Sequence, residues 1–272
     1  MAVLNGTPVG EASLDVATAG IAYLRGVTDG GASVRANLNF VNVKDYGAVG
    51  NGSTNDTTSV NAAKTALRSA GGGTLFFPRG TYMLDSFDWD YLAGGYGKFV
   101  LMGEGSGTII KKRTDDDVTF VTIGRNDTTQ TFQGMVFIDN ICIDGIDGGD
   151  ERVLDLWSMT TLQTRNLRVR YGGKAISLNN CVTCQLLNTQ GSDSKIGLYV
   201  TKYTFGDATY SDPNLNTIIW GAFKDNDSWG IHFEYGKQLV LVGTQIENNG
   251  TLSDNATGGI LVDTNAGALS GV

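Results

Sequence analysis

The sequence has 272 residues, which is enough for one large domain with a small additional segment. A formal net charge of −8, with 28 acidic against 20 basic residues, argues against a nucleic-acid-binding protein. No apolar run is long enough to span a membrane, the first ten residues lack the features of a secretory signal, and the 3 cysteines do not suggest a disulfide framework.

Residues 1 to 36 differ in pattern from the rest of the chain. Four apolar residues follow a 3-4-3 spacing that is typical of a short helix: Leu14, Ala17, Ile21 and Leu24. Gly20 and Gly26 weaken this pattern. We expect residues 1–40 to form a separate N-terminal anchor and neck, with a mobile terminus as the alternative.

The segment 41–84 predicts a strand, a glycine-rich corner, a capped helix, a second corner and further strands. Asp56, Thr57 and Thr58 are residue types that cap helix N-termini, because their side-chain oxygens accept free backbone N–H groups. The residues that follow place an apolar face on the helix: Val60, Ala63 and Leu67. Three successive glycines then end it.

The same segment resembles a known family. Its run DYGAVGNGSTNDTTSVNAA, followed by GGGTLFFPRGTYML, is similar to the opening segment of pectate-lyase-like right-handed β-helix proteins, in the version found in bacteriophage tailspikes. There the pattern is VKDFGAVGDGxTDDT, and here it is VKDYGAVGNGSTNDT. The resemblance implies an all-β fold, a right-handed parallel β-helix over residues 41–272 with its cap at 41–84 and one capping helix. It implies no reaction, because the segment caps the β-helix.

The rest of the chain is repetitive. Short strands with alternate apolar residues begin at Leu154, Ile176, Leu198, Ile231 and Ile260, at spacings of 22, 22, 33 and 29 residues. A repeat of this length predicts a parallel β-solenoid, whereas an antiparallel sandwich would show strands every 8 to 12 residues or so. The longer spacings predict insertions near 203–214 and 249–257. The last residues show no cap, so we expect a β-helix that is incomplete at its C-terminus.

The strand register also predicts which side chains point outward. If Ile231 faces the interior, then His232 and Glu234 face out, with Tyr199 and Trp157 at equivalent positions on earlier coils. Glu234 and Asp263 then stack on neighbouring coils, about 5 Å apart, which suits the carboxylate pair of a retaining glycosidase. We therefore take Glu234 and Asp263 as candidate catalytic residues, and His232, Tyr199 and Trp157 as candidate substrate-binding residues. The alternative is that these acids are merely solvated.

Other clusters carry weaker signals. The acidic run at Asp144, Asp147, Asp150 and Glu151 lacks the spacing of a calcium loop, so a flexible acidic turn is the favoured interpretation. Cys181 and Cys184 have metal-like spacing but lack a second ligand pair. The GEGSG run at 103–107 lacks the Lys-Ser/Thr of a phosphate-binding loop. We expect no metal and no cofactor.

The resemblance implies a tailspike made in the host cytoplasm without a signal peptide and located in the virion. It would be a homotrimer that attaches to phage tail or baseplate proteins through residues 1–40 and recognises a bacterial surface polysaccharide, with neither nucleic-acid binding nor membrane insertion. Whether it also cleaves that polysaccharide, as a hydrolase or a lyase, stays open. The alternatives are a non-catalytic adhesive or structural tail protein, and a bacterial polysaccharide lyase or glycoside hydrolase.

Overall fold

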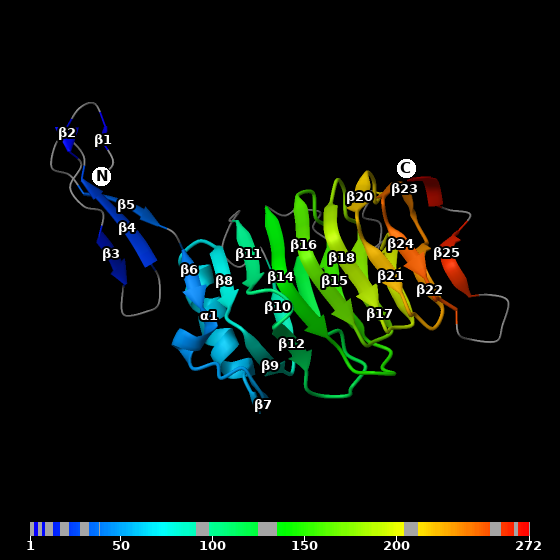
Figure 1. Cartoon of the computed structure of the whole chain (residues 1–272), viewed down its shortest axis with the longest axis horizontal. Helices are drawn as coiled ribbons and strands as arrows, with labels where there is room; N and C mark the ends of the chain where they lie inside the picture. Colours follow the sequence, from blue (N-terminus) through cyan, green and yellow to red (C-terminus); the bar gives the residue numbers. More distant parts are fainter. Residues whose placement is uncertain are drawn as a thin grey trace.

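A computed structural model describes residues 39–90, 98–124, 135–203, 212–250 and 257–263, together with the backbone of five strands before residue 39 and one after residue 265. The chain from residue 40 onward winds into stacked coils whose strands lie side by side along the long axis (Figure 1). Each coil contributes strands to two sheets, and neighbouring strands within each sheet run parallel. The fold is a right-handed parallel β-helix, as the sequence predicted.

The first sheet contains seven parallel strands. In spatial order they are β10 (Phe87–Trp89), β13 (Val121–Gly124), β15 (Arg152–Trp157), β17 (Lys174–Asn179), β19 (Ile196–Thr201), β22 (Trp229–Phe233) and β25 (Gly258–Val262). Successive strands pair in register, so that side chains of equivalent position stack along the sheet. Because of this stacking, the outward side chains of the seven-stranded sheet form straight rows that cross the strands.

The second sheet contains fourteen strands and bends around two sides of the β-helix. Its main path is β6 (Phe40–Asn42), β8 (Gly73–Phe77), β11 (Phe99–Gly103), β14 (Val136–Asp144), β16 (Leu162–Arg170), β18 (Gln185–Ser192), β20 (Asn216–Ile219), β23 (Gly236–Val242) and β26 (Ala266–Gly271). The other strands are β7 (Asn51–Asn55), β9 (Gly80–Leu84), β12 (Thr108–Lys112), β21 (Ala222–Lys224) and β24 (Gln245–Glu247).

Stacked asparagines form the bend within the longest strands. Asn140, Asn166 and Asn188 have φ values of 55°, 50° and 46°, a left-handed conformation that asparagine tolerates better than most residues. Their side-chain amides form a ladder, in which each Nδ2 donates to the Oδ1 of the preceding coil at 2.8 Å. The ladder turns β14, β16 and β18 at the same position, so one strand serves two faces of the β-helix.

The opening segment contains a 3₁₀ helix, η1 (Val43–Tyr46), and one α-helix, α1 (Thr57–Ser69). The apolar face predicted for α1 is buried, and Gly71, Gly72 and Gly73 end the helix with positive φ values. Asp56 occupies the N-cap position, but its side chain makes no capping hydrogen bond. Its carboxylate accepts instead from the N–H groups of Val49 at 2.7 Å and Gly50 at 3.1 Å, and so holds the glycine corner against the helix.

The predicted interior stack is present. Leu154, Ile176, Leu198 and Ile231 are fully buried and paired in register, and Ile260 packs against the same core while remaining partly exposed. The insertions expected near 203–214 and 249–257 contain residues 204–211 and 251–256, which lie outside the described residues. The register across both insertions is nevertheless maintained, since Leu198 pairs with Ile231 and Ile231 with Ile260.

The short helix expected around residues 14–24 is wrong. The backbone there forms β3 (Ser13–Val16) and β4 (Ala22–Val27), which pair antiparallel with Leu14 opposite Leu24, and β5 (Ser33–Asn37) completes a small sheet. Ala17 and Ile21 lie outside the described residues. Cross-strand pairing satisfies the backbone groups that a helix would satisfy internally, and it outweighs a weak local spacing signal. Another two strands, β1 (Val3–Leu4) and β2 (Thr7–Pro8), precede this sheet.

Replacing Leu198 by alanine tests the interior stack. The side chain is completely buried, so its truncation should leave a cavity and lower the free energy of unfolding by about 2–5 kcal/mol. Thermal and urea unfolding measure this loss. Lys237→Ala, at an exposed position on β23 with one surface ion pair to Asp212, is the control and should change stability by at most about 1 kcal/mol. A Leu198→Ala variant as stable as this control would contradict the buried stack.

Candidate functional site

Two rows of outward-facing side chains cross the seven-stranded sheet. One row runs from Asp155 through Ser177 and Tyr199 to His232, and the register places each beside the next. The other runs through Trp157, Asn179 and Thr201, with Glu234 following directly after β22. Although these positions face away from the β-helix interior, most of the side chains are buried. Other side chains therefore cover this face.

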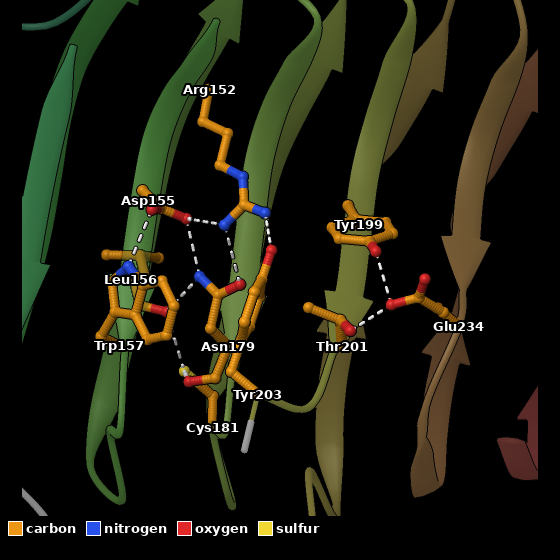
Figure 2. Close-up of polar contacts among 10 residues, drawn as sticks. All are labelled: Arg152, Asp155, Leu156, Trp157, Asn179, Cys181, Tyr199, Thr201, Tyr203 and Glu234. Atoms are coloured by element: carbon orange, nitrogen blue, oxygen red, sulfur yellow. Dashed lines mark hydrogen bonds and ion pairs between the residues drawn. The ribbon is translucent and has the colours of Figure 1, made fainter. Parts of the chain in front are cut away.

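Asp155 is the centre of the first part of the site, and only 4% of it is exposed. Its carboxylate accepts from Trp157 Nε1 at 2.7 Å, from Asn179 Nδ2 at 2.6 Å and from Arg152 Nη1 at 3.3 Å, as Figure 2 shows. The charge is thus paired with a guanidinium and satisfied by two neutral donors, which is the condition under which a carboxylate can be buried. The resulting arrangement is rigid.

Arg152 and Tyr203 cover this network. The Arg152 guanidinium also donates to Asn179 Oδ1 at 3.3 Å and to the hydroxyl of Tyr203 (Figure 2). The Tyr203 ring lies against Trp157, with ring centroids 4.9 Å apart. Trp157 is consequently only 3% exposed, so a sugar would reach its ring only if Tyr203 moved. The role of Trp157 in substrate binding stays a prediction.

Glu234 is the centre of the second part of the site. Its Oε2 accepts from the hydroxyl of Tyr199 at 2.5 Å and from the hydroxyl of Thr201 (Figure 2). Burial, and secondly the hydrogen bond to Glu234, raise the pKa of Tyr199 well above its usual value. Tyr199 therefore stays protonated at neutral pH and acts as a donor that orients the carboxylate of Glu234.

His232 and Asp263 form a separate pair beside it. His232 Nε2 lies 3.2 Å from Asp263 Oδ2, and the imidazole ring meets the Tyr199 ring edge-on at 5.2 Å. Asp263 follows the strand that pairs with β22, and its N–H donates to Phe233 O at 3.1 Å. The structure thus brings the predicted residues Glu234, Asp263, His232 and Tyr199 together. Within the described residues no hydrogen bond links the two carboxylates to each other, and their catalytic role stays a prediction.

A lysine completes the site. Lys174 lies beside Arg152 in register, and its Nζ is 4.8 Å from the centroid of the Tyr199 ring. Burial, and secondly the positive charge of Arg152, lower the pKa of Lys174. Two neighbouring cations thus overlook an aromatic ring and a carboxylate. Next to them Ser177 has a buried hydroxyl oxygen with no hydrogen-bond partner among the described residues, so this part of the site has an unmet polar group.

The outward register of the sequence places Asp155 and Asn179 on this face, but it does not single out Arg152 and Lys174. The spacing of 22 residues that joins Leu154 to Ile176 also joins Arg152 to Lys174. The same spacing, applied to the polar residues that flank Leu154 and Ile176, therefore predicts that Arg152 and Lys174 lie side by side. Tyr203 could not be found in this way, because it lies beyond the end of β19.

Most acids of the other candidate clusters have partners of their own, although Glu151 Oε2 is buried without a hydrogen-bond partner among the described residues. Asp144 is held by Arg170 through hydrogen bonds of 2.8 and 3.1 Å, Asp150 pairs with Lys195, and Glu151 accepts from the N–H of Ile146 at 2.8 Å. The three cysteines are buried free thiols. Across the described ranges, no group of His, Cys, Asp or Glu side chains converges as metal ligands, and no helix is long and apolar enough to cross a membrane.

The fold places this chain in the class of right-handed parallel β-helix proteins. Comparison of its sequence with family models identifies the family. Residues 40–258 match the family described as "Rhamnogalacturonase A/epimerase, pectate lyase-like". The chain therefore belongs to this pectate-lyase-like family.

Relatives by sequence match only a short stretch. Alginate lyase 7 of Azotobacter vinelandii is 49% identical over 47 residues, which are 17% of this chain and 6% of that enzyme. Mannuronan C5-epimerase AlgE4 of the same organism is 40% identical over 72 residues, covering 22% of this chain and 13% of the epimerase. The chain thus matches only a small part of the length of these relatives.

Solved structures extend the similarity in fold. ORF18 of Geobacillus virus E2 superposes with a TM-score of 0.63 at 20% identity, covering 82% of this chain and 48% of that protein. The catalytic domain of Agl-KA superposes with a TM-score of 0.50 at 18% identity, covering 78% of this chain and 43% of that domain. At these identities the similarity concerns the fold.

Replacing Asp155 by alanine tests the buried network. The change leaves Arg152 and Asn179 without their shared acceptor, so the free energy of unfolding should fall by about 3–5 kcal/mol. The matched control is Asp150→Ala, which removes a solvent-exposed pair with Lys195 and should cost at most about 1 kcal/mol. Equal losses in urea unfolding for both variants would show that the Asp155 network is no more important than a surface ion pair.

Proposed function

We propose that this chain is the β-helix part of a phage tailspike that binds a bacterial surface polysaccharide on the outer face of the seven-stranded sheet. The observation that carries this proposal is the site around Tyr199, where two cations, a carboxylate and an imidazole–carboxylate pair surround an aromatic ring. Tyr199 itself is only 8% exposed, so the charged and polar groups around it would make the contacts to a sugar, whose substituents form hydrogen bonds. The family and the fold shared with a viral protein support the same proposal.

The groups of the site can also support cleavage. Glu234 and Asp263 occupy adjacent coils, so their backbones have about the 4.8 Å spacing that suits the carboxylate pair of a retaining glycosidase, while the Glu234 side chain turns toward Tyr199 and Thr201 on the preceding coil. Asp263 can orient His232 as a proton acceptor, while Tyr199 and Thr201 hold the Glu234 carboxylate in place. The proposed chemistry is therefore acid–base cleavage of a glycosidic bond, by hydrolysis or by elimination.

A non-catalytic adhesive is the second candidate function. It is favoured by the fixed partners of each acid, since Asp155 is enclosed by donors and Glu234 is already hydrogen-bonded by two hydroxyls. In either case the protein would be located in the virion, after synthesis in the host cytoplasm, and would attach to tail or baseplate proteins through residues 1–40. A bacterial polysaccharide lyase or glycoside hydrolase is the remaining alternative.

Glu234→Gln separates the candidates. Glutamine keeps an oxygen that accepts from Tyr199 and Thr201 but cannot exchange a proton, so cleavage of host capsule or O-antigen should fall by about 10²–10⁴-fold while glycan binding is retained. Reducing-end release measures hydrolysis, and the absorbance of unsaturated products measures elimination. The control is Glu247→Gln on β24, an exposed acid outside the site. Cleavage at the wild-type rate would exclude Glu234 as a catalyst, and binding without any cleavage by the wild type would establish the adhesive.

Assembly is tested by the mass of the particle in solution. We expect the full-length protein to be a homotrimer about its long axis, since a tailspike presents several copies of one site to a polysaccharide. Multi-angle light scattering of the full-length protein should give three times the mass of one chain. A stable monomer at micromolar concentration would contradict this part of the proposal.

A further inference from the structure

A groove lies on another face of the β-helix, over the strands β8, β11, β14, β16 and β18 that Figure 1 shows side by side. Its volume is about 400 Å³, within the range of ligand-binding pockets. None of the residues in the site around Tyr199 lines it, because those residues come from the seven-stranded sheet and the segments that follow its strands.

The floor of the groove is apolar. Val100 and Phe137 are neighbours in one outward row of the sheet, and Met102 lies in the next row on the same strand as Val100. Phe137 and Met102 are only partly buried. An aromatic ring that is exposed at the base of a groove gives a sugar ring a surface on which to stack.

The row that contains Phe137 changes from apolar to amide at the next coil. Phe137 pairs with Gln163, and Gln163 with Gln185. Both glutamines are exposed, and Gln163 Nε2 donates to Gln185 Oε1 at 3.4 Å, which aligns the two amides. Each amide retains donor or acceptor capacity toward the groove. Stacking and hydrogen-bonding groups are therefore separated by one coil, about 4.8 Å, which is close to the length of one sugar residue in an extended chain.

Two cations border the groove. Arg165 is held by Asp139 through a hydrogen bond from Nε to Oδ1 at 2.9 Å and a second from Nη2 to Oδ2, yet 60% of the arginine side chain is exposed. Lys98 places its Nζ 5.2 Å from the centroid of the Phe137 ring. The groove is lined by two cations, Lys98 and Arg165, and by one carboxylate, that of Asp139. Its lining therefore has a net positive charge, although the chain as a whole has a net charge of −8.

From this geometry we infer that the groove binds one pyranose unit of a glycan chain, with its ring stacked on Phe137 and its hydroxyls bonded to Gln163 and Gln185. The positive balance favours an acidic sugar over its neutral counterpart. The inference rests on the proposed polysaccharide function for its choice of ligand, but it requires no catalysis at Glu234. A second binding position on a different face would hold a polysaccharide during repeated encounters, because linked sites raise the overall affinity.

The side chain of Met102 reports directly on this groove. The full chain is labelled with ¹³C at the methionine methyl groups, and Met102→Leu assigns the Met102 signal. The probes are methyl glycosides of galactose, glucose and mannose, and the three corresponding uronic acids, each titrated to high millimolar concentration. At least one uronic acid should shift the Met102 signal in a saturable way, more tightly than its neutral counterpart. The signal of Met159, which is fully buried in the interior, should not move.

Substitutions complete the test. Gln163→Ala combined with Gln185→Ala should raise the dissociation constant about tenfold or more, because two hydrogen bonds are lost. Lys98→Ala should abolish the preference for the acidic sugar. Gln245→Ala, at an exposed glutamine on β24 outside the groove, is the matched control and should leave binding unchanged.

Two outcomes would overturn the inference. The absence of a saturable Met102 shift with all six glycosides would show that the groove is no sugar site. A Met102 shift that depends on protein concentration, and not on sugar, would identify the groove as a contact between copies of the chain. Failure of the proposed function is recognised separately, since the Met102 titration does not depend on polysaccharide cleavage or on Glu234.

Discussion

Parallel backbone hydrogen bonding between successive coils sets the register on which every other feature of this β-helix depends. Because each strand pairs in register with the strands of the neighbouring coils, a residue at a given position stacks on its counterpart about 4.8 Å away. The apolar stack through Leu154, Ile176 and Leu198 follows from this register, and so do the outward rows on the same strands. A shift of one residue in any strand would exchange the interior and exterior side chains of that strand.

The same register explains why charged groups can be buried on the outer face of the seven-stranded sheet. Asn179 lies on the coil next to that of Asp155, and Arg152 lies on the same strand as Asp155. The three side chains therefore satisfy one another's hydrogen-bonding groups. An isolated carboxylate at this position would be too costly to bury. The network in turn fixes Tyr203 over Trp157, and it holds Arg152 over the Tyr199 ring, beside Lys174. Rigid, pre-oriented polar groups are what a binding or catalytic surface requires.

The faces of the β-helix carry different chemistry because each outward row is free to vary while the interior is not. The seven-stranded sheet presents acids, hydroxyls and an imidazole around Tyr199. The groove over β14 and β16 presents an apolar floor with amides and an anchored arginine. The side formed by the second half of β14 and β16 carries ion pairs such as Asp144 with Arg170. Stacked coils thus allow one chain to bear separate polar surfaces on a single continuous core.

The sequence by itself determined the fold and the inward or outward direction of most side chains. Interior positions such as Ile176 and Ile231 could be read because burial imposes an apolar residue at the same place in each coil, and the opening segment could be read because its glycines and the apolar face of its helix follow local rules. Asn140, Asn166 and Asn188 adopt a left-handed conformation that asparagine favours locally. Their hydrogen-bonded ladder and the bend that it stabilises are visible only in the structure.

Only the tertiary structure decided which side chains meet. The pairing of Glu234 with Tyr199 and Thr201, and the covering of Trp157 by Tyr203, join residues on different coils whose separation along the chain varies with each insertion. Asp56 likewise binds the glycine corner and not the helix it precedes. The strands around Leu14 and Leu24 depend on cross-strand pairing that a helical spacing conceals. Local patterns report burial and direction, whereas partners depend on which groups the packed coils bring within hydrogen-bonding distance.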